Sequence, residues 1–88
     1  MSETREIRLK RLKIRAWRRG IKEMDLLLGG FADSQMAGLS EAELDAFEAL
    51  MDEADQDLLR WVTGLEPAPG HHLPMLRRVA PDAQLREA

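Results

Sequence analysis

Apolar residues recur at intervals of three and four along most of the chain, which is the spacing of an amphipathic helix. One stripe consists of Ile21, Met24, Leu27, Leu28 and Phe31. A second consists of Leu44, Phe47, Leu50, Met51 and Ala54. Charged residues fill the positions between, so each helix has one face directed at a core. No segment alternates as a half-buried strand would, and the pattern predicts an all-α protein.

Capping residues divide this pattern into about five short helices in a compact bundle, over residues 4–18, 21–31, 41–54, 55–63 and 73–79. Thr4 and Asp55 are expected N-caps because their side chains can accept from free amides of a first turn. Ser40 and Glu43 have the spacing of a capping box, in which each side chain bonds the other residue's backbone amide.

Glycine and proline predict where the helices end. Gly29-Gly30 is expected to end the second helix, and Gly64 the fourth, with Leu65 folding back onto its last turn. Pro81 follows the last helix. We therefore expect one helical domain over residues 1–80 and a frayed tail over residues 81–88.

Composition argues against most catalytic and metal-binding classes. The 88 residues include no cysteine, which excludes disulfides, thiolate metal sites and a cysteine nucleophile. The two histidines, His71 and His72, are adjacent in a Pro/Gly-rich loop, where we expect exposed side chains and neither a catalytic pair nor metal ligands. No apolar run approaches the roughly 18 residues of a membrane span, so we expect no membrane insertion.

Charge is divided sharply along the chain. Residues 1–22 contain nine Lys or Arg and two acids, whereas residues 23–66 contain one Arg and twelve acids. Such a division indicates either internal pairing of a basic and an acidic helix or a charged partner surface. The arginines of the first helix, Arg8, Arg11, Arg15 and Arg18, recur at helical spacing and form a basic ridge. Internal pairing is the simpler interpretation of that ridge.

The segment Arg18-Arg19-Gly20-Ile21-Lys22-Glu23-Met24-Asp25 is the candidate functional site. Gly20 interrupts a helix-favouring run at a cost of about 1 kcal/mol relative to Ala, so it bends the chain or admits another backbone closely. Glu23 lies about 200° around the helix from the core-facing Ile21, at about 100° per residue. We expect Arg19, Gly20 and Glu23 to form an outward patch that binds a partner, with Arg18 and Asp25 beside them. An intramolecular Arg19–Glu23 ion pair is the alternative, but it leaves the glycine unexplained.

Two other functional classes stay open. The basic first helix could bind nucleic acid as part of an accessory protein, although the acidic remainder would repel a polyanion. The chain could also be a structural subunit of a larger complex. We expect a protein-binding role and neither enzymatic activity nor nucleic-acid binding.

The same segment carries a resemblance to a known family. Arg19-Gly20-Ile21-Lys22-Glu23 matches an Arg-Gly-x-x-Glu motif, and residues 18–28 and 39–64 resemble the succinate dehydrogenase assembly factor 2 family of flavinylation factors in order and spacing. The resemblance implies a five-helix fold. It also implies a chaperone that binds the flavoprotein subunit of succinate dehydrogenase, or of fumarate reductase in some bacteria, and promotes covalent attachment of FAD.

The resemblance assigns residues and partners as well. Arg19, Gly20 and Glu23 would contact the client protein, with Arg18 and Asp25 as flanking support. FAD would belong to the client, with no cofactor held stably by this chain, and direct contact with FAD is neither required nor excluded. The start of the chain, which we interpret as unprocessed and in which Arg outnumbers Lys, favours a bacterial cytoplasmic location, with a processed protein of the mitochondrial matrix as the alternative.

Overall fold

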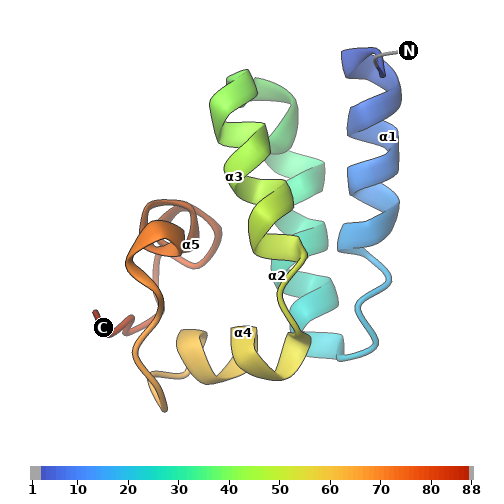
Figure 1. The fold of residues 1–88 in the computed structure, drawn as a ribbon. Coiled ribbons are helices and arrows are strands. Elements are labelled where there is room, and N and C mark those ends of the chain that lie inside the picture. The colour runs from blue at the N-terminus through green and yellow to red at the C-terminus, as the bar shows by residue number, and fades with distance from the viewer. Residues whose placement is uncertain (1–2, 88) are drawn as a thin grey trace.

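The computed structural model describes residues 3–87, which form five α-helices and two short 3-10 helices (Figure 1). In chain order these are α1 (Arg5–Ala16), α2 (Lys22–Ser34), η1 (Met36–Gly38), α3 (Glu41–Met51), α4 (Asp55–Val62), η2 (Gly70–His72) and α5 (Leu73–Val79). Helix α1 packs against α2 and α3, α4 crosses one end of the bundle against α2, and α5 lies against α3 and α2. The predicted all-α bundle of about five helices is confirmed.

Two of the three predicted N-caps are present. The Thr4 side chain accepts from the Ile7 amide at 3.2 Å. The Ser40 hydroxyl accepts from the Glu43 amide at 3.1 Å, and the Glu43 carboxylate accepts from the Ser40 amide at 2.8 Å, so the capping box is complete. The third prediction is wrong: Ala54 occupies the cap of α4, and Asp55 is its first helical residue.

Helix α2 continues through Gly29 and Gly30 to Ser34, so its predicted glycine end is wrong. Gly29 is required for packing instead, because a Cβ there would lie 2.3 Å from Cδ2 of Trp17. Gly64 does end α4, with φ of 77°, as expected. The predicted packing of Leu65 is wrong, since that residue is 71% exposed.

The core is formed mainly by large aliphatic and aromatic side chains from all five helices. Its largest fully buried side chains are Leu12, Met24, Leu28, Leu44, Phe47, Leu50, Met51, Leu58 and Leu76. The rings of Phe31 and Phe47 lie 5.2 Å apart between α2 and α3. Trp61 is buried, as expected for a core anchor of α4.

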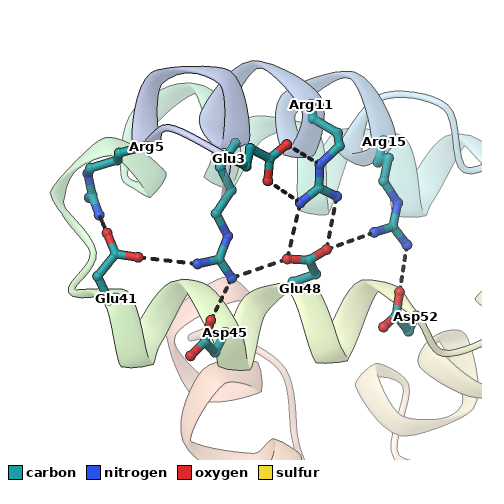
Figure 2. A network of polar contacts seen from close by, with 9 residues as sticks. Glu3, Arg5, Arg11, Arg15, Glu41, Asp45, Glu48 and Asp52 are labelled. Atoms are coloured by element: carbon teal, nitrogen blue, oxygen red, sulfur yellow. Dashed lines mark hydrogen bonds and ion pairs between the residues drawn. The ribbon is translucent and has the colours of Figure 1, made fainter. Parts of the chain in front are cut away.

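Charge pairing with α3 holds the basic face of α1 (Figure 2). Glu48 is the central acceptor, bonding Arg8 at 3.1 Å and Arg11 at 2.9 Å and lying 3.6 Å from Arg15. The other pairs join Arg5 to Glu41, Arg8 to Glu41 and Asp45, Arg11 to Glu3, and Arg15 to Asp52. Most of the basic ridge is therefore paired internally, as the simpler interpretation of the sequence predicts. To bind the phosphate backbone of a nucleic acid, these arginines would have to break their ion pairs with the carboxylates.

This pairing changes the titration of the acids. The hydrogen bond from Arg11 lowers the pKa of Glu48 below its ordinary value of 4.5, against the opposing effect of its partial burial. The hydrogen bond from Arg11 lowers the pKa of Glu3 in the same way. Helix α1 thus depends on ionised carboxylates as well as on its buried Leu12 and Ala16.

The segment after α5 folds back along the loop that precedes it. The Ala68 amide donates to the Arg86 carbonyl at 2.8 Å, and Arg77 pairs with Glu87 at 2.8 Å. The segment makes these contacts through Glu87, and Ala88 lies outside the described residues; the frayed tail over residues 81–88 stays a prediction.

Candidate functional site at the start of α2

Gly20 makes the turn between α1 and α2. Its φ is 92°, a conformation that L side chains rarely adopt, so another residue here is strained. No atom lies within 4 Å of the position a Cβ would take, so the space beside the turn is open. The glycine therefore bends the chain and leaves its backbone accessible from outside.

Arg19 does not point outward, and that prediction is wrong. Its Nε lies 2.7 Å from Oδ1 of Asp55, and the two side chains are only 10% and 16% exposed. The terminal nitrogens donate to the carbonyls of Met51 and Glu53, at 2.6 and 2.8 Å. The alternative Arg19–Glu23 ion pair is absent from the pairs that the structure describes within residues 3–87. Arg19 therefore fastens the turn between α3 and α4.

This placement has a simple physical reason. Carbonyls at the C-terminal end of a helix lack amide partners within the helix and need other donors. The guanidinium group supplies such donors at fixed angles, while Asp55 balances its charge. The sequence signal was present in Asp55, which was assigned to capping instead.

Asp25 also acts within the molecule. Its Oδ1 accepts from the backbone amide of Arg19 at 2.7 Å, which ties the turn to the first part of α2. Ile21 occupies the cap of α2 and offers no side-chain hydrogen bond there. The contact with Asp25 helps to fix the course of the chain on either side of Gly20.

The other charged residues of the segment, Arg18, Lys22 and Glu23, are exposed and make no ion pair within residues 3–87. Throughout residues 3–87, only three carboxylates make no side-chain pair with a basic group: Glu23, Asp25 and Asp82. Over the same residues, the cations without a carboxylate are Arg18, Lys22 and Arg86. Three of these six groups, Arg18, Lys22 and Glu23, flank Gly20 and are exposed. The unpaired charges therefore gather at the same turn that the Arg-Gly-x-x-Glu motif indicates.

Glu23 also borders a hollow of about 350 Å³ between α2, α4 and the segment that follows α5. The lining is mainly apolar and includes Met24, Leu27, Leu59, Val62, Val79, Pro81 and Ala83, with Thr63 and Asp82 beside them. Sequence reasoning missed this hollow, because its far wall belongs to the segment that was expected to fray.

The adjacent histidines differ from each other. His72 is 3% exposed, so its predicted exposure is wrong, whereas His71 is exposed as expected. Nε2 of His72 lies 2.8 Å from Oε2 of Glu53, and the buried Trp61 ring is 5.7 Å away. Ligand atoms of Glu53, His71 and His72 all lie within 4.8 Å of one another, close enough to hold a metal ion. The direct bond between His72 and Glu53 satisfies both groups without an ion.

Comparison with protein families gives one match, to the Sdh5 model described as "Flavinator of succinate dehydrogenase", over residues 10–81. The chain belongs to this family. The Sdh5 match covers the turn at Gly20, all of α2 to α5 and most of α1.

Curated relatives in the Sdh5 family are both bacterial and mitochondrial. "FAD assembly factor SdhE" of Acetobacter pasteurianus is 38% identical over 80 residues, which is 90% of this chain and 73% of that protein. "Succinate dehydrogenase assembly factor 2, mitochondrial" of Mycosarcoma maydis is 44% identical over 68 residues, 77% of this chain but 29% of the relative. The protein of the same name from Schizosaccharomyces pombe is 43% identical over 67 residues, which is 76% of this chain and 48% of that relative. The chain thus spans less than half the length of these two mitochondrial relatives.

Among residues 3–87, none of the helices combines the length and the apolar composition needed to cross a bilayer.

Proposed function

We propose that this protein is an assembly factor that binds the flavoprotein subunit of succinate dehydrogenase and promotes covalent attachment of FAD to it. The names of its relatives support the role, since they include an FAD assembly factor and several succinate dehydrogenase assembly factors. Fumarate reductase is a second candidate client. The site of action would be the bacterial cytoplasm, with the mitochondrial matrix as the alternative.

The observation that carries this proposal is the charge left free around Gly20. Nearly all other charged side chains in the described residues are paired internally, whereas Arg18, Lys22 and Glu23 flank a glycine with open space beside it. A client can therefore approach the turn and pair with both signs of charge. In this proposal Arg18, Gly20 and Glu23 contact the client, and Arg19 and Asp25 hold them in position.

Such a factor needs no catalytic group. A protein that binds one client conformer better than another by about 1–3 kcal/mol shifts the population of that conformer roughly 5- to 150-fold. FAD and the residue that it modifies would both belong to the client. The factor would hold a conformation in which the bond forms, with no cofactor of its own.

The test replaces Gly20 by Arg in cells that lack the wild-type protein. The new side chain would occupy the open space and strain the turn, so client binding and covalent flavin should both fall sharply while the helices remain. Covalent flavin is measured as fluorescence of the flavoprotein subunit on a denaturing gel, and client binding as co-purification. Glu23→Gln should give a smaller loss in the same direction.

The matched control is Glu6→Gln, which neutralises an exposed carboxylate on α1 that is 82% exposed and paired only with Lys10. Circular dichroism checks that each variant is folded. Normal covalent flavin with Gly20→Arg would refute the assignment of this surface. Loss with both Glu23→Gln and Glu6→Gln would point to a general charge effect instead.

A further inference from the structure

The hollow beside Glu23 combines an apolar floor with an acidic rim. Its walls come from Leu27 on α2, from Leu59 and Val62 on α4, and from Val79 at the end of α5. Glu23 and Asp82, which are far apart in the sequence, both lie among its lining residues. Both carboxylates lack a basic partner within residues 3–87. Two of the three carboxylates without a basic partner in that range therefore border one apolar hollow.

We infer that this hollow binds a segment of the client protein that presents an aliphatic or aromatic side chain next to a lysine or arginine. The apolar side chain would enter the hollow, and the cation would pair with Glu23 and Asp82. The inference rests on the proposed function and extends its binding surface from the turn at Gly20 across α4 to residues 79–83.

The size of the hollow favours this kind of occupant. A volume of about 350 Å³ is at the small end of pockets that bury drug-sized ligands, about 300–1,000 Å³. It accommodates one or two side chains and is small for a dinucleotide such as FAD. Protein interfaces concentrate their binding energy in a few anchors of this kind, which fill a pocket and are surrounded by polar contacts.

The charges favour the same occupant. Removing Leu27, Leu59 and Val62 from water is favourable for any apolar partner, but an acidic partner would meet Glu23 and Asp82 unpaired. A basic residue beside the apolar anchor avoids that repulsion. The binding energy would therefore come mainly from the apolar contact, and the selectivity and salt dependence from the two carboxylates.

The experiment uses residues outside the Arg-Gly-x-x-Glu motif, so that it tests the hollow alone. Ala83→Trp is designed to fill the hollow with an indole ring. The Ala83 side chain makes no hydrogen bond that this change would remove. Its control is Ala42→Trp, at an exposed position of α3 away from the hollow. Asp82→Asn and Asp82→Lys remove and reverse the rim charge, with Glu6→Gln as the control for charge.

Binding of the purified flavoprotein subunit to the full chain is measured by calorimetry at low and high ionic strength. Ala83→Trp should weaken binding roughly 30-fold, the effect of losing one anchor contact. Asp82→Asn should weaken it about twofold to fivefold at low salt and reduce the salt dependence. Asp82→Lys should weaken it further, and both control variants should bind like wild type.

The outcomes separate this inference from the function on which it rests. If wild type binds the flavoprotein and raises its covalent flavin, but Ala83→Trp and Asp82→Lys bind equally well, the hollow is not part of the interface and the proposed function stands. If wild type neither binds nor raises covalent flavin, the proposed function fails and this inference with it. Circular dichroism and melting curves identify any loss that comes from unfolding, and the exposed Asp82 variants then decide the result.

Discussion

Replacing Arg19 by Met should destabilise the whole protein, because the guanidinium group joins three parts of the structure. The change removes the ion pair with Asp55 and the donors to the carbonyls of Met51 and Glu53. Removing one partner of a buried ion pair costs about 3–5 kcal/mol. Asp55 is 16% exposed, so water can partly replace the lost donor, and we expect a decrease of about 3 kcal/mol in the free energy of unfolding.

That loss is large for a chain of 88 residues. At about 0.05–0.15 kcal/mol per residue, the whole domain is stable by roughly 4–13 kcal/mol. A decrease of about 3 kcal/mol corresponds to a fall in melting temperature of at least about 12 °C. Arg19→Lys keeps the charge but not the forked geometry, so we expect about half this effect.

Urea unfolding followed by circular dichroism measures the change. A double-mutant cycle with Asp55→Ala isolates the ion pair, for which we expect a coupling of about 1–3 kcal/mol. If Arg19 instead pointed at a client, Arg19→Met would melt within about 3 °C of wild type and lose only binding. That result would refute the placement of Arg19 as a fastening of the α3–α4 turn.

Three further changes test other contacts. Gly29→Ala should lower stability by about 1–3 kcal/mol, because the new Cβ would lie 2.3 Å from Trp17, and tryptophan emission should shift to the red as that ring moves into water. Ser40→Ala should lower stability by about 1 kcal/mol through loss of the capping box, measured by thermal melting. Acid should release α1 before the core unfolds. Arg11 lowers the pKa of Glu48, so the stabilisation by the ionised Glu48 carboxylate is complete above pH 4.5 and is lost as the pH falls through the lowered pKa. Hydrogen exchange along α1 would report this loss.

Two of these tests have an internal comparison. Gly30→Ala, one position along α2, meets no atom within 4 Å and should stabilise the helix by up to about 1 kcal/mol. Equal effects at Gly29 and Gly30 would contradict the packing on Trp17. A variant with Glu48→Gln should show a weaker acid-dependent release of α1, because Glu3, whose pKa Arg11 also lowers, still contributes. Unchanged release would contradict the role of Glu48.

The helices followed from local rules, and so did most of their starts. Thr4 and Ser40 act as caps because a helix start needs only nearby acceptors, which the sequence displays directly. The same rule predicts Asp55 as an N-cap, and that prediction is wrong because the carboxylate of Asp55 pairs with Arg19, which is distant in the sequence. The predicted helix end at Gly29 is wrong for a similar reason: the local preference of glycine is overridden by contact with Trp17, which follows α1.

The candidate site shows the same limit. The motif indicated the correct turn, and the exposure of Arg18, Gly20 and Glu23 agrees with the sequence pattern. It could not show that Arg19 turns inward, because its acceptors at Met51 and Glu53 become neighbours only when α3 and α4 are in place. The apolar hollow depends on the return of residues 79–83 to α2 and α4, which no periodicity records.

The inward orientation of Arg19 links the turn at Gly20 to residues more than 30 positions away in the sequence. Since this side chain is hydrogen-bonded to the residues that join α3 to α4, a substitution at Asp55 would loosen the backbone beside Gly20 without altering the exposed surface proposed to bind a client. Loss-of-function variants should therefore fall into two groups, one on the exposed turn and one at its buried anchor. Lower temperature or a stabilising ligand should restore the function of the second group of variants and leave the first group unchanged.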